Sequence, residues 1–212
     1  MAGGTRFAKG FTLIELAVTL TVALVLAMLA LPSFEGMRQR AATRGAANQL
    51  LSFWSQARLE AVKRNAMVKV GVVQTNNGAQ FCLGAATTTD SADATPCDCT
   101  VAAPADAATT CDVARFPADM GASQSEWNRV TLSGVTLGGG TLITAIQPAV
   151  IEPKRATLTV SADDGTITVL GPPGNFSYKM NLSVDKFGRA LICQSTASTH
   201  NLPDYADKKC AN

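Results

Sequence analysis

An unbroken apolar run over residues 11–31 constrains this 212-residue chain more than any other feature. A helix that crosses a bilayer needs roughly 20 consecutive apolar residues, and the run is just long enough. It carries one charge, Glu15, close to its start, and Pro32 follows its end. Removing this span and its leader leaves enough chain for one soluble domain and no more.

The apolar run and its flanks differ from those of an ordinary secretory signal peptide. A basic leader with Arg6 and Lys9 and no acidic residue precedes it, as in a signal peptide. However, the run is longer than the roughly 7–15 apolar residues of such a signal, and no A-x-A cleavage site follows it. A carboxylate also lies where a signal peptide is most apolar.

The stretch Lys9-Gly10-Phe11-Thr12-Leu13-Ile14-Glu15 resembles the class III signal of type IV pilins and type II secretion pseudopilins. The resemblance implies a cut after Gly10 by the prepilin peptidase on the cytoplasmic side, followed by methylation of Phe11. It also implies that the apolar segment is kept as an inner-membrane anchor and later packs with other pilins in a helical filament. Residues 1–10 are then a cleaved leader, and residues 11–32 form the transmembrane and filament-core helix.

Glu15 and Pro32 are the expected assembly residues. A carboxylate at a helix centre in lipid costs about 2.5–3.5 kcal/mol, and less near an end. After cleavage Glu15 would lie on the first turn, where the positive helix N-terminus and a free amino group compensate it. The resemblance implies that a neighbour's amine can serve instead and set the register; the alternative is an acid that snorkels to the interface. Pro32 should kink the helix without necessarily ending it.

Residues 33–66 are predicted to continue the helix in amphipathic form. Apolar residues recur there at helical spacing, namely Leu50, Phe53, Trp54, Ala57, Ala61 and Val62. This stripe should pack on a globular domain, with Asn65 as the stop. The run from Gln56 to Asn65 is similar to the helix end of FimT/FimU-type minor pilins and GspH-type minor pseudopilins, in which a β-strand follows.

Residues 67–212 are predicted to form a disulfide-containing β domain. Residues 67–73 and 79–83 read as strands joined by a hairpin turn at Asn76-Asn77-Gly78, and residues 84–112 as a long loop. Further strands are expected at residues 130–137, 142–146, 156–160, 166–170, 178–184 and 189–193. Tight turns are expected at Asp163-Asp164-Gly165 and at Asp185-Lys186-Phe187-Gly188, and Gly138-Gly139-Gly140 is a flexible turn. The fold class is therefore α+β, with one long N-terminal helix packed on a mostly antiparallel β-sheet domain, type IV pilin-like.

Six cysteines in a domain of this size indicate an oxidising compartment and disulfides. This agrees with the periplasmic C-terminal domain that the pilin resemblance implies. Four of them lie in or beside the long loop, and their pairing is open among three connectivities; they are Cys82, Cys97, Cys99 and Cys111. The pilin resemblance implies a disulfide between Cys193 and Cys210. The alternative is that either of these pairs with the first cluster.

Neither catalysis nor a metal site is predicted, and no cofactor is expected. The single histidine, His200, lies in a polar C-terminal loop beside serines that form no recognisable nucleophile motif. Asp163 and Asp164 could ligate calcium, but alternating oxygen ligands do not follow and the hairpin turn explains them.

DNA is a possible partner, though a less favoured one. Some FimT-type pilins bind DNA through a C-terminal Gly-Arg-x-Arg motif, whereas here Gly188-Arg189-Ala190-Leu191 lacks the second arginine. The mature chain, without Arg6 and Lys9, has 16 basic and 16 acidic residues, which leaves a weak electrostatic footprint. The possible DNA-binding residues are Lys186, Arg189, Lys208 and Lys209.

The sequence thus favours a minor type IV pilin that helps to initiate or cap pilus assembly, first in the inner membrane as a single-pass protein and then at the cell surface. Two alternatives are a GspH-type minor pseudopilin of type II secretion and a DNA-binding pilin for natural transformation.

Overall fold

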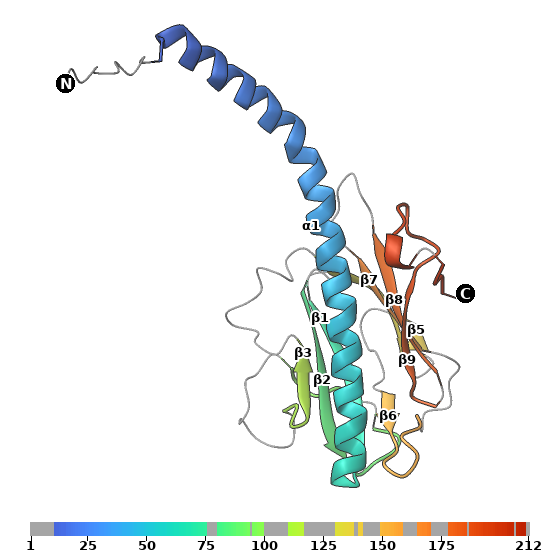
Figure 1. Cartoon of the computed structure of the whole chain (residues 1–212). Helices are drawn as coiled ribbons and strands as arrows, with labels where there is room; N and C mark the ends of the chain where they lie inside the picture. Colours follow the sequence, from blue (N-terminus) through green and yellow to red (C-terminus); the bar gives the residue numbers. More distant parts are fainter. Residues whose placement is uncertain are drawn as a thin grey trace, which may run out of the picture. The chain divides into compact units, whose positions relative to one another are not determined.

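The computed structural model describes residues 11–75, 80–93, 95–99, 110–116, 130–137, 140–141, 149–158, 165–170, 178–185, 187–205 and 207–210. The elements in these ranges are α1 (Leu13–Arg64), β1 (Met67–Thr75), β2 (Gln80–Thr88), β3 (Ala114–Phe116), β4 (Thr131–Leu137), β5 (Gly140–Thr141), β6 (Ala149–Ile151), β7 (Gly165–Leu170), β8 (Lys179–Val184), β9 (Ala190–Gln194) and the 3-10 helix η2 (Pro203–Tyr205) (Figure 1).

The chain divides into two compact units, Met1–Arg38 and Gln39–Asn212. The first unit holds the beginning of α1, whose described side chains up to Leu29 are all exposed. By length and composition, α1 is the one helix in the described part of the chain that could cross a membrane. It runs through Pro32, so this proline does not end the helix.

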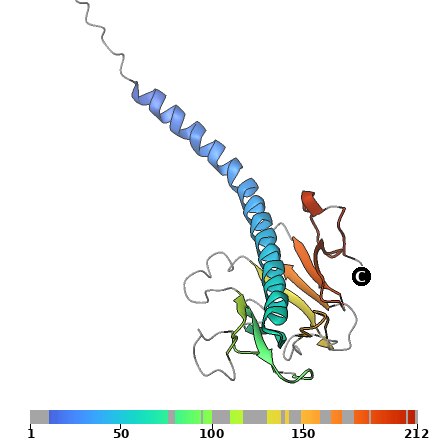
Figure 2. The ribbon, with the colours of Figure 1, turned by 60° about the horizontal axis from the view of Figure 1, so that its bottom comes forward.

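The second unit contains two antiparallel sheets against which α1 packs. One sheet has the order β3-β2-β1-β6 and the other the order β5-β4-β7-β8-β9. Every pairing between these strands is antiparallel. One long helix on antiparallel sheet confirms the predicted α+β class (Figure 2).

The largest apolar core among the described residues joins the helix to both sheets. α1 contributes a stripe at helical spacing that includes Leu50, Phe53 and Trp54, each at most 4% exposed. In β8, buried and half-buried residues alternate, as expected for a strand with one face on a core. The predicted stripe is correct except at Val62, which is 53% exposed because it lies about 100° around the helix axis from Ala61, outside the buried face.

The helix ends where the sequence predicts. Asn65 has a φ of 47°, the left-handed conformation that asparagine tolerates better than most residues. Its N–H donates to Val62 O, and the next N–H, of Ala66, donates to Ala61 O, both at 3.2 Å. These two bonds form a Schellman motif, which satisfies carbonyls at the helix end and turns the chain directly into β1.

Several strand predictions are wrong in extent or pairing. β2 runs five residues beyond Leu83, into the segment predicted as loop, because residues 84–88 stay paired with β1. The three-residue strands β3 and β6 are not predicted, being too short to show a period.

Of the strand expected at residues 156–160, the structure describes residues 156–158, which make one isolated bridge, between Leu158 and Ile151. Ala156 has a φ of 51°, which interrupts extended backbone. The expected hairpin across Asp163-Asp164-Gly165 is also wrong in its partners, because β7 pairs with β4 and β8. Residues 142–146 and the turn residues 76–78 and 163–164 lie outside the described residues, although β1 and β2 do pair as the predicted hairpin.

Candidate functional site

The start of α1 is closed by a reciprocal pair of residues, Thr12 and Glu15. Thr12 immediately precedes the helix, and Glu15 is its third residue. The Glu15 N–H donates to Thr12 Oγ1 at 3.3 Å, while Glu15 Oε2 lies 3.5 Å from both the backbone N and the Oγ1 of Thr12. This Thr-x-x-Glu arrangement is a capping box, in which each residue satisfies backbone donors of the first turn.

The capping box gives Glu15 a local role that does not depend on a neighbour. The carboxylate lies in the first turn, where the positive end of the helix dipole favours it by about 0.3–1 kcal/mol. Thr12 is a functional candidate that the sequence reasoning missed. The signal that identifies it is the threonine three residues before the glutamate, at the edge of an apolar run.

Directly after the box, the helix surface is uncharged and almost entirely apolar, and the hydroxyls of its two threonines, Thr19 and Thr21, donate to backbone carbonyls of the helix. From Leu16 to Leu29 each side chain is exposed and none is charged; Leu24 and Leu29, for example, are 58% and 71% exposed. Such a helix is stable in a bilayer or packed among other apolar helices, because water would solvate it poorly. Gly10 lies outside the described residues, and so does the side chain of Pro32.

Several positions of the helix-end motif, from Gln56 to Asn65, have a structural role. Ala57 and Ala61 are fully buried against the sheets. Glu60 accepts hydrogen bonds from Lys63 (3.1 Å) and Arg64 (2.8 Å), and its pKa is lowered, first by the bond from Arg64 and then by the bond from Lys63. Arg64 also reaches Asp112 at 2.8 Å. The motif therefore serves to dock the helix end on the domain.

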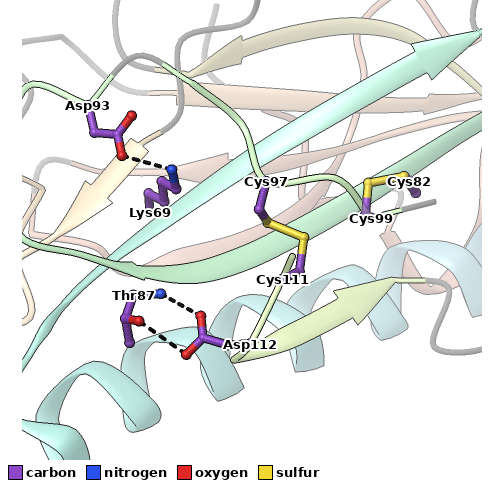
Figure 3. The surroundings of a disulfide bond; sticks show 8 residues. All are labelled: Lys69, Cys82, Thr87, Asp93, Cys97, Cys99, Cys111 and Asp112. Carbon is purple, nitrogen blue, oxygen red and sulfur yellow. Dashed lines mark hydrogen bonds and ion pairs between the residues drawn. A yellow bond between two sulfur atoms is a disulfide. The ribbon is translucent and has the colours of Figure 1, made fainter. Parts of the chain in front are cut away.

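Three disulfides use all six cysteines. The pairs are Cys82–Cys99, Cys97–Cys111 and Cys193–Cys210. The third is the pair that the resemblance implies, and the first two settle the connectivity that the sequence leaves open. Figure 3 shows the first two disulfides side by side over β2.

Gly84 explains how these two disulfides fit against the sheet. A Cβ at this position would collide with the sulfur atoms of Cys97 and Cys111 and lie 3.3 Å from the Cβ of Cys99. The backbone of β2 therefore approaches the disulfides as closely as a glycine permits. Around it Cys82, Ala86 and the other three cysteines form a small second core.

A half-buried ion pair, which the sequence does not predict, joins the same region to the sheet. Lys69 in β1 donates to Asp93 Oδ2 at 2.7 Å, and the lysine side chain is only 10% exposed (Figure 3). Hydrogen bonds from Lys69 first, and then from Thr95, hold the pKa of Asp93 far below its usual value. Within the predicted loop, Asp93 therefore anchors the chain to β1.

The possible DNA-binding cations do not form one cluster among the described residues. Arg189 precedes β9 and pairs with Asp185 at 2.7 Å, whereas Lys208 and Lys209 lie beside Gln194 at the far end of that strand. Burial opposes ionisation of Asp185, yet hydrogen bonds from Arg189 lower its pKa. Five residues of strand separate the two groups by roughly 16 Å. Lys186 lies outside the described residues.

His200 is held in the C-terminal loop against an aromatic ring. Its ring centroid lies 5.9 Å from that of Tyr178, whose hydroxyl accepts a hydrogen bond from Arg40 at 3.1 Å. This packing explains the single histidine as part of the attachment of the loop to α1.

Residues 5–31 match the family model described as the prokaryotic N-terminal methylation motif. No curated protein and no solved structure matches the chain. The matched segment contains Arg6 and Lys9 of the leader, Phe11, Glu15 and the apolar beginning of α1. It supports a type IV pilin-like protein or pseudopilin with a class III signal. The motif implies processing by a prepilin peptidase and assembly with other pilins, and together with the apolar helix it suggests membrane anchoring.

Proposed function

We propose that this chain is a minor type IV pilin of the FimT/FimU kind, with a structural rather than a catalytic role. The observation that carries the proposal is the capped start of α1: a capping box of Thr12 and Glu15 followed by an exposed, uncharged helix, inside a methylation motif. Cleavage after Gly10 frees the amine of Phe11, and α1 then leaves the bilayer to pack among the helices of other pilins. The chain helps to initiate or cap the filament.

In this proposal Glu15 acts in two stages. In the isolated chain its carboxylate caps its own helix through Thr12. In the filament it pairs with the amine of a neighbouring Phe11 and sets the register. The exchange is feasible because the 3.5 Å contacts to Thr12 are long for hydrogen bonds and can give way to a charged donor. Pro32 changes the local geometry of α1, and the packing of α1 among other pilin helices requires this changed geometry.

A direct test measures the incorporation of a Glu15→Ala variant. We expect the variant to be cleaved normally but to be largely lost from sheared surface filaments. Glu35→Ala is the matched control, since it removes a second glutamate from the same helix and should be incorporated normally. Equal recovery of both variants in the filaments would show that Glu15 does not set the register.

A broader test asks whether the chain belongs to a pilus or to a secretion system. In a strain that lacks the gene, we expect the amount of major pilin in the sheared surface fraction to fall, and the wild-type chain to restore it. Normal surface pilin together with a defect in protein secretion would instead favour the GspH-type minor pseudopilin. Normal surface pilin together with a defect in DNA uptake would favour the DNA-binding pilin, for which the separated positions of Arg189 and Lys208 give little support.

A further inference from the structure

Strand β9 is an edge of the five-stranded sheet, and half of its backbone groups face away from β8 (Figure 1). Asp185 N–H donates to Arg189 O at 3.0 Å before the strand, and Ser195 N–H donates to Lys179 O at 3.1 Å after it. The pairing of β9 with β8 runs between these two bonds without a shift in register. Because the bonding direction alternates along a strand, the odd-numbered residues of β9 bond β8 and the even-numbered residues face outward.

The chain itself satisfies the last of the three outward residues, which are Ala190, Ile192 and Gln194. Gln194 N–H donates to Lys208 O at 2.8 Å, and Gln194 O accepts from Cys210 N–H at 3.1 Å. The outward N–H and C=O groups of Ala190 and Ile192 form no such bond with any residue that the structure describes. β9 therefore offers two donors and two acceptors to a further strand, beside a position that residues 208–210 already occupy.

β9 lacks the features that protect an edge strand from pairing, which are short length, charge, proline and bulges. The other edge strands in the described ranges, β3, β5 and β6, are at most three residues long. β9 has five residues, with no charge, no proline and no bulge. At its centre Leu191 is 71% exposed, and among the strand side chains that the structure describes it is the only large apolar one that is exposed. β9 is therefore the edge best suited to the addition of a strand.

The side chains beside the open edge define what a partner must bring. Arg189 and Leu191 share one face of β9, and the ring of Phe187, 52% exposed, lies 5.6 Å from Arg189 Cζ. Asp185 already pairs with the Arg189 charge. A residue added opposite Leu191 would form a pair without hydrogen bonds, in which the two Cβ atoms lie about 4.5–5.5 Å apart. An apolar side chain at that position of the partner would cover Leu191.

The open edge is too short for another folded sheet. It is limited to residues 190–192, because residues 208–210 pair with Gln194 at one end and the chain turns back to β8 through Gly188 at the other. A strand of a folded sheet has about five or six residues on average and would run into residues 208–210. The same limit applies to β9 of a second copy, which carries its own residues 208–210 at the same place. A single extended segment fits the space.

We propose that β9 binds an extended, otherwise unfolded segment of a different protein as an additional antiparallel strand, with an apolar residue opposite Leu191. Antiparallel pairing is the more stable arrangement per residue, and two partner residues can then exchange both backbone bonds with Ala190 and with Ile192. The backbone bonds supply affinity, and the contact with Leu191 supplies selectivity. A contact of so few residues is weak and reversible. It is separate from the packing of α1 among pilin helices and does not depend on the pilin assignment.

The first test measures amide hydrogen exchange by NMR in the full chain in detergent. The probe is a synthetic peptide of seven residues, with valine at its three central positions and threonine elsewhere. At saturation we expect exchange at Ala190 and Ile192 to slow at least about fivefold, because their N–H groups gain acceptors. Leu191 and Cys193, which already bond β8, should change little. The same peptide with N-methyl groups on its three central residues should have no effect. Unchanged exchange at Ala190 and Ile192, or an equal effect of the methylated peptide, overturns the proposal.

Two variants test the edge itself. Leu191→Lys should weaken peptide binding roughly tenfold, since lysine on an edge strand opposes the addition of a further strand. Leu59→Lys is the matched control, because Leu59 is a leucine of similar exposure (65%) on α1. Ala190→Pro removes one outward N–H and keeps the bonds to β8, so it should weaken binding about fivefold. Mobility on a non-reducing gel checks that each variant has formed its disulfides. Binding that Leu191→Lys leaves unchanged, or that Leu59→Lys weakens equally, contradicts the proposal.

The second test asks which molecule occupies the edge in cells. A photoreactive phenylalanine replaces Leu191 in the full chain, and mass spectrometry identifies the cross-linked peptides. We expect a peptide from a protein that is not a pilin, and its synthetic copy should bind the purified chain less well when Ala190→Pro is present. Cross-links that are absent, or that join only pilin subunits or a second copy, overturn the proposal. Surface pilin in the gene-deletion strain tests the pilin assignment separately, since β9 can bind such a segment in either case.

Discussion

The two disulfide-bonded segments of the second unit are attached to it in different ways. The first segment consists of the described residues between β2 and β3, which we call the lobe. Two disulfides hold it buried against β2, and their four cysteines are at most 4% exposed. In the C-terminal loop, residues 193–210, a single disulfide closes the loop and Cys193 and Cys210 are only half-buried. The lobe is held by buried disulfides that form a second core, whereas the loop is held by hydrogen bonds and by one buried apolar side chain, that of Leu202.

Gln194 holds the C-terminal loop. Its side chain donates to Asn201 Oδ1 at 3.0 Å and accepts from the N–H of Leu202 at 3.1 Å. Its backbone N–H donates to Lys208 O at 2.8 Å, and its O accepts from the N–H of Cys210 at 3.1 Å. Leu202 is fully buried in a cluster with Tyr178 and Met180. Gln194, near the start of the loop, can therefore hold in place a loop that has no core of its own.

Removal of disulfides should give the largest difference between the two segments. For Cys97→Ala with Cys111→Ala we expect a loss of about 3–5 kcal/mol in the free energy of unfolding, since a buried cross-link and its packing both disappear. For Cys193→Ala with Cys210→Ala we expect about 2–3 kcal/mol, because the Gln194 bonds persist. Loop-closure entropy alone predicts nearly equal losses, as the sequence separations are 14 and 17. Equal shifts in thermal unfolding of the full chain in detergent would show that the buried packing contributes nothing.

Substitution of Gln194 tests whether its side-chain hydrogen bonds hold the C-terminal loop in place. Gln194→Met keeps the volume but leaves the buried N–H of Leu202 without its acceptor, so we expect a loss of about 1–3 kcal/mol. Gln49→Met, at an exposed position of α1, is the control and should change the free energy of unfolding by less than about 0.5 kcal/mol. Urea unfolding measures both, and limited proteolysis should show cleavage within residues 195–209 in Gln194→Met alone. If the loop of Gln194→Met resists proteolysis as the wild-type loop does, the disulfide and not Gln194 holds the loop in place.

The lobe should also respond to acid. Because Lys69 lowers the pKa of Asp93 in the folded chain, the pair contributes stability that is fully present above the unfolded pKa of about 4 and is lost as pH falls below it. Asp93→Asn should therefore be less stable than wild type at pH 7 and should lose less stability than wild type between pH 5 and pH 2. Melting temperatures across this range measure the effect. Identical pH profiles for the two proteins would mean that Asp93 is not what makes the lobe acid-sensitive.

The smallest effect is expected for the ion pair of the C-terminal loop. Arg44 and Asp204 are 2.6 Å apart, but their side chains are 42% and 55% exposed. Solvent and salt screen such a pair, so Asp204→Asn should cost no more than about 0.5 kcal/mol at low salt and almost nothing at 1 M salt. A loss as large as that of Asp93→Asn would remove the contrast between the lobe and the loop.

The sequence predicts the elements that have a clear period. The helical stripe around Leu50 and Trp54, the cap at Asn65 and the alternation in β8 are all visible in the residues. The strands β3 and β6 are not, because three residues carry no period and their pairing depends on distant partners.

The functional residues likewise divide into those that a local sequence motif reveals and those that only the fold brings together. Glu15 is predicted from its local motif, and Thr12 could have been. By contrast, Asp93 becomes an anchor only because the fold brings it to Lys69, which lies 24 residues earlier. The contact between Ala156 and Gly188 is likewise not predictable from the sequence, since the two residues belong to separate turns that meet only in three dimensions.

The burial of β1 on both faces has a consequence for when this domain can mature. Val68, Val70 and Val72 face the helix, whereas Lys69 and Val73 lie under the lobe. The ladder hydrogen bonds of β1 can form in any compartment, but its outer face is covered only when the lobe is held down by its disulfides. Formation of these two disulfides is thus a step of folding itself, and we expect the amide hydrogens of β1 to exchange quickly until the disulfides have formed.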